Sequence, residues 1–141
     1  MASDVFHQLY YHFVWATKNR MPLITEENKR FVISEIEIQC RTRGGTLLVY
    51  NVMPDHAHLA VALPPTACVA TFIGKVKGAS SRNLSKEPIW ELPFSWQDGY
   101  GVVTFRKGEL DKVTKYVENQ EEIHASRKIS RILERINAND T

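Results

Sequence analysis

This chain lacks the features that mark several classes of protein. It has two isolated cysteines, Cys40 and Cys68, and no Cys-x-x-Cys pair, so we expect both to be reduced thiols. It has no secretory signal pattern and no apolar run of membrane-spanning length, which predicts a soluble, cytoplasmic protein without a membrane partner. It also has no large excess of charge, because a net charge of +2 is too small to indicate nucleic acid by itself.

Length and composition favour one compact domain. The chain has 141 residues, 43% of them hydrophobic, so a single core can form without disulfides or metal staples. It contains no internal repeat and no low-complexity linker. We therefore predict a single domain over residues 1–141.

The most informative motif is His56-Ala57-His58, within residues 51–63. Side chains alternate across a strand, so His56 and His58 project to one face, where two imidazoles could hold one divalent cation. The opposite face carries an apolar stripe of Ala57, Leu59, Val61 and Leu63. An exposed strand face that holds two histidines by chance is the competing interpretation, and the motif alone does not decide between them.

A second candidate site lies on a helix predicted over residues 109–124. Leu110, Val113 and Val117 recur at helical spacing and mark its buried stripe. Tyr116 and Gln120 are four residues apart and are therefore neighbours beside that stripe. The tyrosine could simply belong to the core, but a half-buried glutamine needs polar partners, and a metal ion would be one.

The order of elements predicts an α+β, ferredoxin-like fold (split βαβ): an antiparallel sheet with helices packed on one face. The pattern is βαββαβα, with Thr25 as a helix N-cap, Gly44-Gly45 as a helix end and Pro54-Asp55 as a hairpin turn. Strands are expected at 6–16, 46–53, 56–63 and 99–105, and helices at about 25–43, 69–84 and 109–124. Residues 126–141 are predicted to form an amphipathic helical tail.

Basic residues gather in two segments. Lys75, Lys77 and Arg82 lie in one, and Lys18 and Arg20 in the other, and together they could form a patch that faces phosphates. A solvated helix face explains the same charges equally well.

Five segments, in order, resemble the single-tyrosine transposases of small insertion sequences, the IS200-like family of the HUH nuclease superfamily. They are residues 12–22, 54–59, 75–82, 94–101 and 116–120. The resemblance implies that His56, His58 and Gln120 bind Mg²⁺ or Mn²⁺ and that Tyr116 is the nucleophile. Ala57 is smaller than the family's usual middle residue, and no acidic element is recognised after His124.

The resemblance also implies the reaction and the partners. The expected enzyme nicks single-stranded or hairpin DNA, forms a 5′-phosphotyrosine intermediate and rejoins strands. A homodimer is expected, formed through the strand at 6–16 or its neighbours at a sheet edge. Two alternatives stay open: a domesticated relative that nicks repeated hairpins, and a non-catalytic nucleic-acid-binding module on the same fold.

Overall fold

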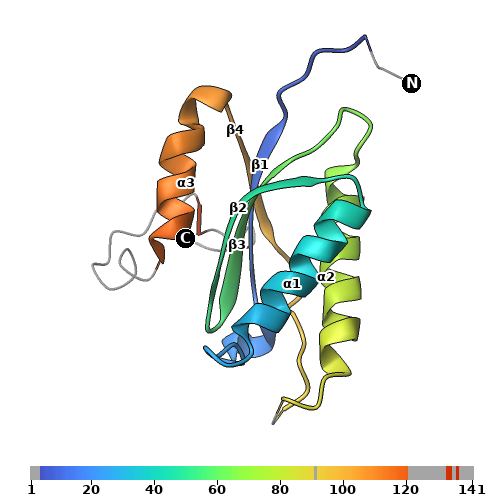
Figure 1. The fold of residues 1–141 in the computed structure, drawn as a ribbon, viewed down its shortest axis with the longest axis vertical. Coiled ribbons are helices and arrows are strands. Elements are labelled where there is room, and N and C mark those ends of the chain that lie inside the picture. The colour runs from blue at the N-terminus through green and yellow to red at the C-terminus, as the bar shows by residue number, and fades with distance from the viewer. Residues whose placement is uncertain (1–3, 91, 121–132, 135, 137–141) are drawn as a thin grey trace.

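The computed structural model describes residues 4–90, 92–120, 133, 134 and 136. Its centre is an antiparallel sheet in the order β2-β3-β1-β4 (Figure 1). The strands are β1 (Tyr10–Ala16), β2 (Thr46–Met53), β3 (His56–Ala62) and β4 (Gly101–Phe105). The helices are α1 (Lys29–Thr42), α2 (Val69–Ser85) and α3 (Leu110–Glu118). The predicted α+β class and the order βαββαβα are confirmed.

One face of the sheet packs against α1 and α2 and forms the main core. Phe13 and Trp15 of β1 are fully buried there, beside the predicted apolar stripe of β3. Gly44 ends α1 as predicted, with a φ of +85° that an L side chain rarely adopts. Gly45 is needed for space, because a Cβ there would lie 2.9 Å from the Phe72 ring of α2.

The other face of the sheet packs against α3, which corrects the expectation that all helices share one face. Val113 and Val117 of α3 lie against Val49 and Ala60 of the sheet. Figure 1 shows α3 on the side of the sheet away from α1 and α2. These sheet positions alternate with the main core positions, so they point the other way. The histidine face of β3 is therefore covered by the helix that carries Tyr116.

Strand β1 is shorter than predicted and lies inside the sheet. It begins at Tyr10 because that residue already pairs with Ala62 of β3 and Phe105 of β4, where both neighbours end. Phe6, the predicted first residue, is 85% exposed. Since β1 has a neighbour on each side, it cannot pair across an edge, and the two edge strands are β2 and β4.

The first helix also begins later than predicted. Thr25 and Asn28 exchange reciprocal hydrogen bonds of 2.8 and 3.3 Å, and α1 starts at Lys29. At the other end of the chain, α3 is described to Glu118 and the chain to Gln120. The predicted continuation to 124 and most of the predicted tail helix at 126–141 lie outside the described residues. In the part of the chain that is described, no helix is long and apolar enough to span a membrane.

Thr17, just after β1, joins the end of the sheet to two loops. Its backbone N–H donates to the Asp55 carbonyl at 2.9 Å, and it forms an isolated bridge with Trp96. The next residue, Lys18, donates its backbone N–H to Ser95 O at 2.9 Å. The turn that precedes His56 and the loop around Trp96 therefore meet at one residue.

Candidate active site

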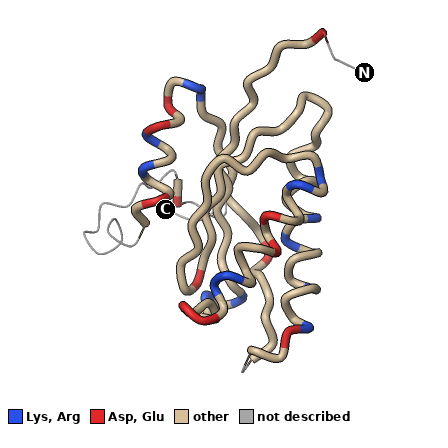
Figure 2. The backbone as a smooth tube through the Cα atoms, in the orientation of Figure 1, with Lys and Arg blue, Asp and Glu red and all other residues tan. Residues whose placement is uncertain are grey.

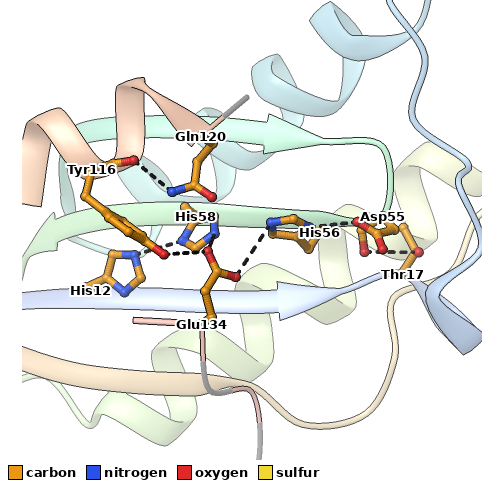
Figure 3. A network of polar contacts seen from close by, with 8 residues as sticks. All are labelled: His12, Thr17, Asp55, His56, His58, Tyr116, Gln120 and Glu134. Carbon is orange, nitrogen blue, oxygen red and sulfur yellow. Dashed lines mark hydrogen bonds and ion pairs between the residues drawn. The ribbon is translucent and has the colours of Figure 1, made fainter. Parts of the chain in front are cut away.

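His56 and His58 point to the α3 face of β3, as their spacing predicts (Figure 3). His56 is 5% exposed and His58 is fully buried, so neither is an incidental surface histidine. The Nδ1 atom of each histidine has a polar partner. Asp55 Oδ1 lies 2.7 Å from His56 Nδ1, and His12 Nε2 lies 3.0 Å from His58 Nδ1. Both Nδ1 atoms are thereby occupied, which leaves the Nε2 atoms to face the site.

The Nε2 atoms face a carboxylate that sequence reasoning missed. Glu134 Oε1 lies 2.9 Å from His58 Nε2, and its Oε2 lies 3.8 Å from His56 Nε2 (Figure 3). Burial raises the pKa of Glu134, but hydrogen bonds and the two histidines outweigh it and lower the pKa from 4.5 to about 2. Glu134 is therefore an anion at neutral pH.

Tyr116 of α3 reaches the same carboxylate. Its hydroxyl donates to Glu134 Oε1 at 3.0 Å, and its ring packs edge-on to His58 with centroids 6.0 Å apart. Gln120 is fully buried one turn later, and its Nε2 donates to the Tyr116 carbonyl at 2.8 Å. Figure 3 shows Tyr116 of α3 and Gln120, two residues after the end of that helix, both on the side of the histidines. The sequence pattern thus brings the predicted nucleophile and all three predicted ligands to one place.

The donor set fits a divalent cation. One ligand atom from each of His56, His58 and Glu134 lies within 4.8 Å of the others. Two imidazole nitrogens and a carboxylate oxygen, all largely withdrawn from water, are a usual ligand set for such an ion. This cluster suggests a divalent metal site.

Two members of the site, Glu134 and His12, were not identified from the sequence. The prediction that no acidic element follows His124 is wrong, because Glu134 stands between Leu133 and the buried Ile136. The helical periodicity after Ser126 predicts which apolar residues are buried, and it gives no role to the carboxylate between them. His12 had a usable signal: it precedes Val14 and Ala16 by two and four residues, so all three lie on the strand face of the site histidines, where Val14 and Ala16 are buried.

Lys and Arg residues are spread over several elements of the fold (Figure 2), and the predicted basic residues of α2 divide between two hollows. Lys77 and Arg82 line a groove of about 610 Å³ between α2 and residues 94–100. Lys75 lines a different hollow, beside Arg43. Lys18 and Arg20 lie in a 3-10 turn whose backbone contacts Ser95, at the border of the groove.

Lys77 holds the loop of the groove in place. Its Nζ donates to Gln97 O at 2.8 Å and also to Gly99 O. Burial lowers the pKa of Lys77 from 10.5 to about 8, although Asp98 opposes that shift. Arg82, by contrast, has an exposed side chain.

Comparison with known proteins identifies the family. The family model "Transposase IS200 like" matches residues 5–120. The chain belongs to the IS200-like transposase family. It is 28% identical over 123 residues to the ISDra2 transposase TnpA of Deinococcus radiodurans, covering 81% of this chain and 85% of that protein. It is 32% identical over 116 residues to the IS200 transposase of Salmonella typhimurium, covering 78% and 75%.

Solved structures agree with this family. A structure assigned as a Deinococcus radiodurans transposase superposes with a TM-score of 0.66 at 28% identity, over 85% of this chain and 96% of that one. A REP-associated tyrosine transposase bound to a REP hairpin gives 0.65 at 13% identity, over 99% and 95%. The second likeness is one of fold. Membership of this family implies an enzyme that cleaves DNA.

Proposed function

We propose that this IS200-like transposase nicks single-stranded or hairpin DNA with Tyr116 as the nucleophile and rejoins strands from a 5′-phosphotyrosine intermediate. One observation carries the proposal: the Tyr116 hydroxyl and the Nε2 atoms of His56 and His58 converge on one buried carboxylate. Metal-assisted attack on a phosphodiester requires the nucleophile and the metal ligands to lie close enough to act on the same phosphate.

Tyr116 attacks the phosphorus of the scissile phosphodiester. The bond from its phenol oxygen to phosphorus forms, the bond from phosphorus to O3′ breaks, and the 3′ oxygen leaves to become a hydroxyl. Glu134 Oε1 accepts the hydrogen bond of the Tyr116 hydroxyl and so orients the phenol oxygen. The phenol proton passes to water, and the leaving 3′ oxygen takes one up. A phenol with a pKa of about 10 is a weak nucleophile, so alignment and proton removal matter. A later 3′-hydroxyl reverses the step without ATP, because the phosphotyrosine keeps the bond energy.

His56, His58 and Glu134 would hold the cation, with Gln120 as the further predicted ligand. We infer Mg²⁺ or Mn²⁺ for this family. When bound, the ion acts as a Lewis acid on a non-bridging phosphate oxygen. The contribution of the chain is orientation: Asp55 and His12 occupy the Nδ1 atoms, so that the Nε2 atoms face inward.

The DNA is proposed to run from this site into the groove that Arg82 lines. Thr17 contacts both the turn at Asp55 and Trp96 of the groove, so the site and the groove lie at the same end of the sheet. The groove offers the ring of Tyr100 and the charge of Arg82, and stacking plus a basic lining is how proteins hold unpaired strands. The similar fold of a transposase bound to a REP hairpin supports a hairpin substrate.

A covalent-adduct assay tests the proposal. The full chain is incubated with Mn²⁺ and a hairpin oligonucleotide labelled on the 5′-phosphate side of the scissile bond, then denatured. We expect a labelled protein band that Tyr116→Phe abolishes and that Tyr50→Phe, a control at an exposed tyrosine of β2, retains. An adduct of undiminished yield with Tyr116→Phe would disprove the assignment of the nucleophile.

A further inference from the structure

His12 is a buried polar side chain in the middle of the sheet. It lies on β1, is 1% exposed, and pairs in register with Ala60 of β3, next to the His58–Val14 pair. Its Nε2 lies 3.0 Å from His58 Nδ1, and the two rings are 5.1 Å apart between centroids. A histidine in an otherwise apolar stretch of strand needs a reason, because a leucine would bury there without a polar cost.

The two ring nitrogens of His58 have different partners. Nδ1 faces His12 inside the sheet, and Nε2 faces Glu134 in the site (Figure 3). A neutral imidazole carries its proton on one nitrogen only. For Nε2 to bind a cation, that proton must sit on Nδ1, and His12 Nε2 must then be the acceptor.

We propose that His12 is a positioning residue that fixes the tautomer and ring orientation of His58, so that His58 presents Nε2 to the cation. The inference rests on the proposed metal site and extends it. His56 has a parallel arrangement, since Asp55 Oδ1 accepts from its Nδ1 at 2.7 Å. The difference is that Asp55 is partly exposed at a turn, whereas His12 is buried on a face of the sheet.

A matched pair of variants separates the hydrogen bond from the packing. Gln carries an amide oxygen at about the reach of an imidazole Nε2, and Met has nearly the same shape without a strong acceptor. Mn²⁺ affinity of the full chain, without DNA, is measured by electron paramagnetic resonance of the free ion. We expect His12→Met to weaken Mn²⁺ binding by about 10–100-fold, the usual loss when an outer partner of a metal ligand is removed. His12→Gln should recover most of that loss.

Two outcomes of this titration overturn the role of His12. One is a His12→Met protein that binds Mn²⁺ as tightly as the wild type. The other is equal weakening by His12→Met and His12→Gln, which would place the effect in packing. His56→Ala in the same assay isolates the metal site itself. If the wild type binds no Mn²⁺, or His56→Ala binds it unchanged, the proposed function fails and not only this inference.

A spectrum of the unmutated protein decides the matter even where a variant does not fold. In ¹⁵N-histidine-labelled protein loaded with Mg²⁺, long-range ¹H–¹⁵N correlations report which ring nitrogen carries the proton. We expect Nδ1–H on His58 and Nδ1–H on His12. A proton on Nε2 of His12 in the Mg²⁺-loaded protein would overturn the proposal, because that nitrogen could then not accept from His58 Nδ1.

Discussion

The hydroxyl of Tyr116 and the carboxylate of Glu134 share a hydrogen bond of 3.0 Å although they lie 18 residues apart in the chain. Glu134 also contacts both histidines of β3, so its carboxylate connects Tyr116 of α3 to the histidines of the sheet. A single carboxylate thus links the residues that the reaction needs. Glu134 is the residue on which the site's geometry depends most.

The first prediction concerns that carboxylate. Glu134→Gln keeps the shape of the side chain and removes its charge. We expect Mn²⁺ affinity to fall by more than about tenfold and the rate of adduct formation to fall with it, because an amide is a weaker ligand and hydrogen-bond acceptor than a carboxylate. The control is Glu87→Gln, which removes an exposed carboxylate after α2. Equal rates for the two variants would exclude a role for Glu134.

The second prediction concerns the remaining ligands. His56→Ala and His58→Ala should abolish cleavage but leave hairpin binding close to the wild type. His58→Ala should also lower the melting temperature, because His58 is fully buried and contacts both His12 and Glu134. Gln120→Ala should be milder for cleavage, since an amide is the weakest ligand. It should cost about 1–3 kcal/mol of stability, because its loss opens a buried hole and removes the hydrogen bond that Gln120 Nε2 donates to the Tyr116 carbonyl. Full activity in excess chelator would contradict the metal mechanism.

The sequence predicted the sheet and most of the site because both follow from local spacing. Alternation along residues 56–63 placed the histidines opposite the core, and the interval from Tyr116 to Gln120 placed both on one helix face. Glu134 could not be predicted in this way, because its contact with His58 joins segments that no periodicity relates. The face on which α3 packs could have been deduced, since a nucleophile must reach the histidine side of β3.

The third prediction separates two basic residues of the same groove. Arg82→Gln should weaken binding of single-stranded DNA and reduce the slope of log K against log salt by about 0.7, as expected for one lost phosphate contact. Lys77→Met should leave that slope nearly unchanged and lower the melting temperature, because Lys77 ties the loop at Gln97 and Gly99 to α2. Identical salt slopes for wild type and Arg82→Gln would exclude a phosphate contact at Arg82.

The fourth prediction uses the two thiols as reporters of the fold. Burial raises the pKa of Cys40 to about 12, whereas a hydrogen bond with Thr71 lowers the pKa of the exposed Cys68. Iodoacetamide at pH 8 should therefore modify Cys68 in the native protein and Cys40 only after unfolding. Between pH 9 and 12 an unfolded chain loses the Cys40 proton that the folded chain keeps, so stability should fall as the pH rises. Cys40→Ala should remove that part of the decline. Rapid labelling of native Cys40 would show that the α1 core is open.

The last prediction concerns assembly. Moving an element requires two cut ends, and one tyrosine per chain holds one covalent end at a time, so we propose a homodimer with two sites. Strand β4 is an edge with an exposed Val102 that could pair with its copy, a role that the internal β1 cannot take. Sedimentation equilibrium should give twice the chain mass of 16.2 kDa. A protein that cleaves as a strict monomer would contradict this.

Mixing two inactive variants then shows which chain supplies the nucleophile. Tyr116 lies against His58 of its own chain, with ring centroids 6.0 Å apart, so each site can be built within one chain. A mixture of Tyr116→Phe and His56→Ala proteins, refolded together to exchange subunits, should therefore form no more adduct than either alone. Adduct formation that rises in the mixture would mean that Tyr116 crosses to the partner's histidines. The two results differ in one quantity, the adduct yield, because a crossed dimer of these variants regains one complete site.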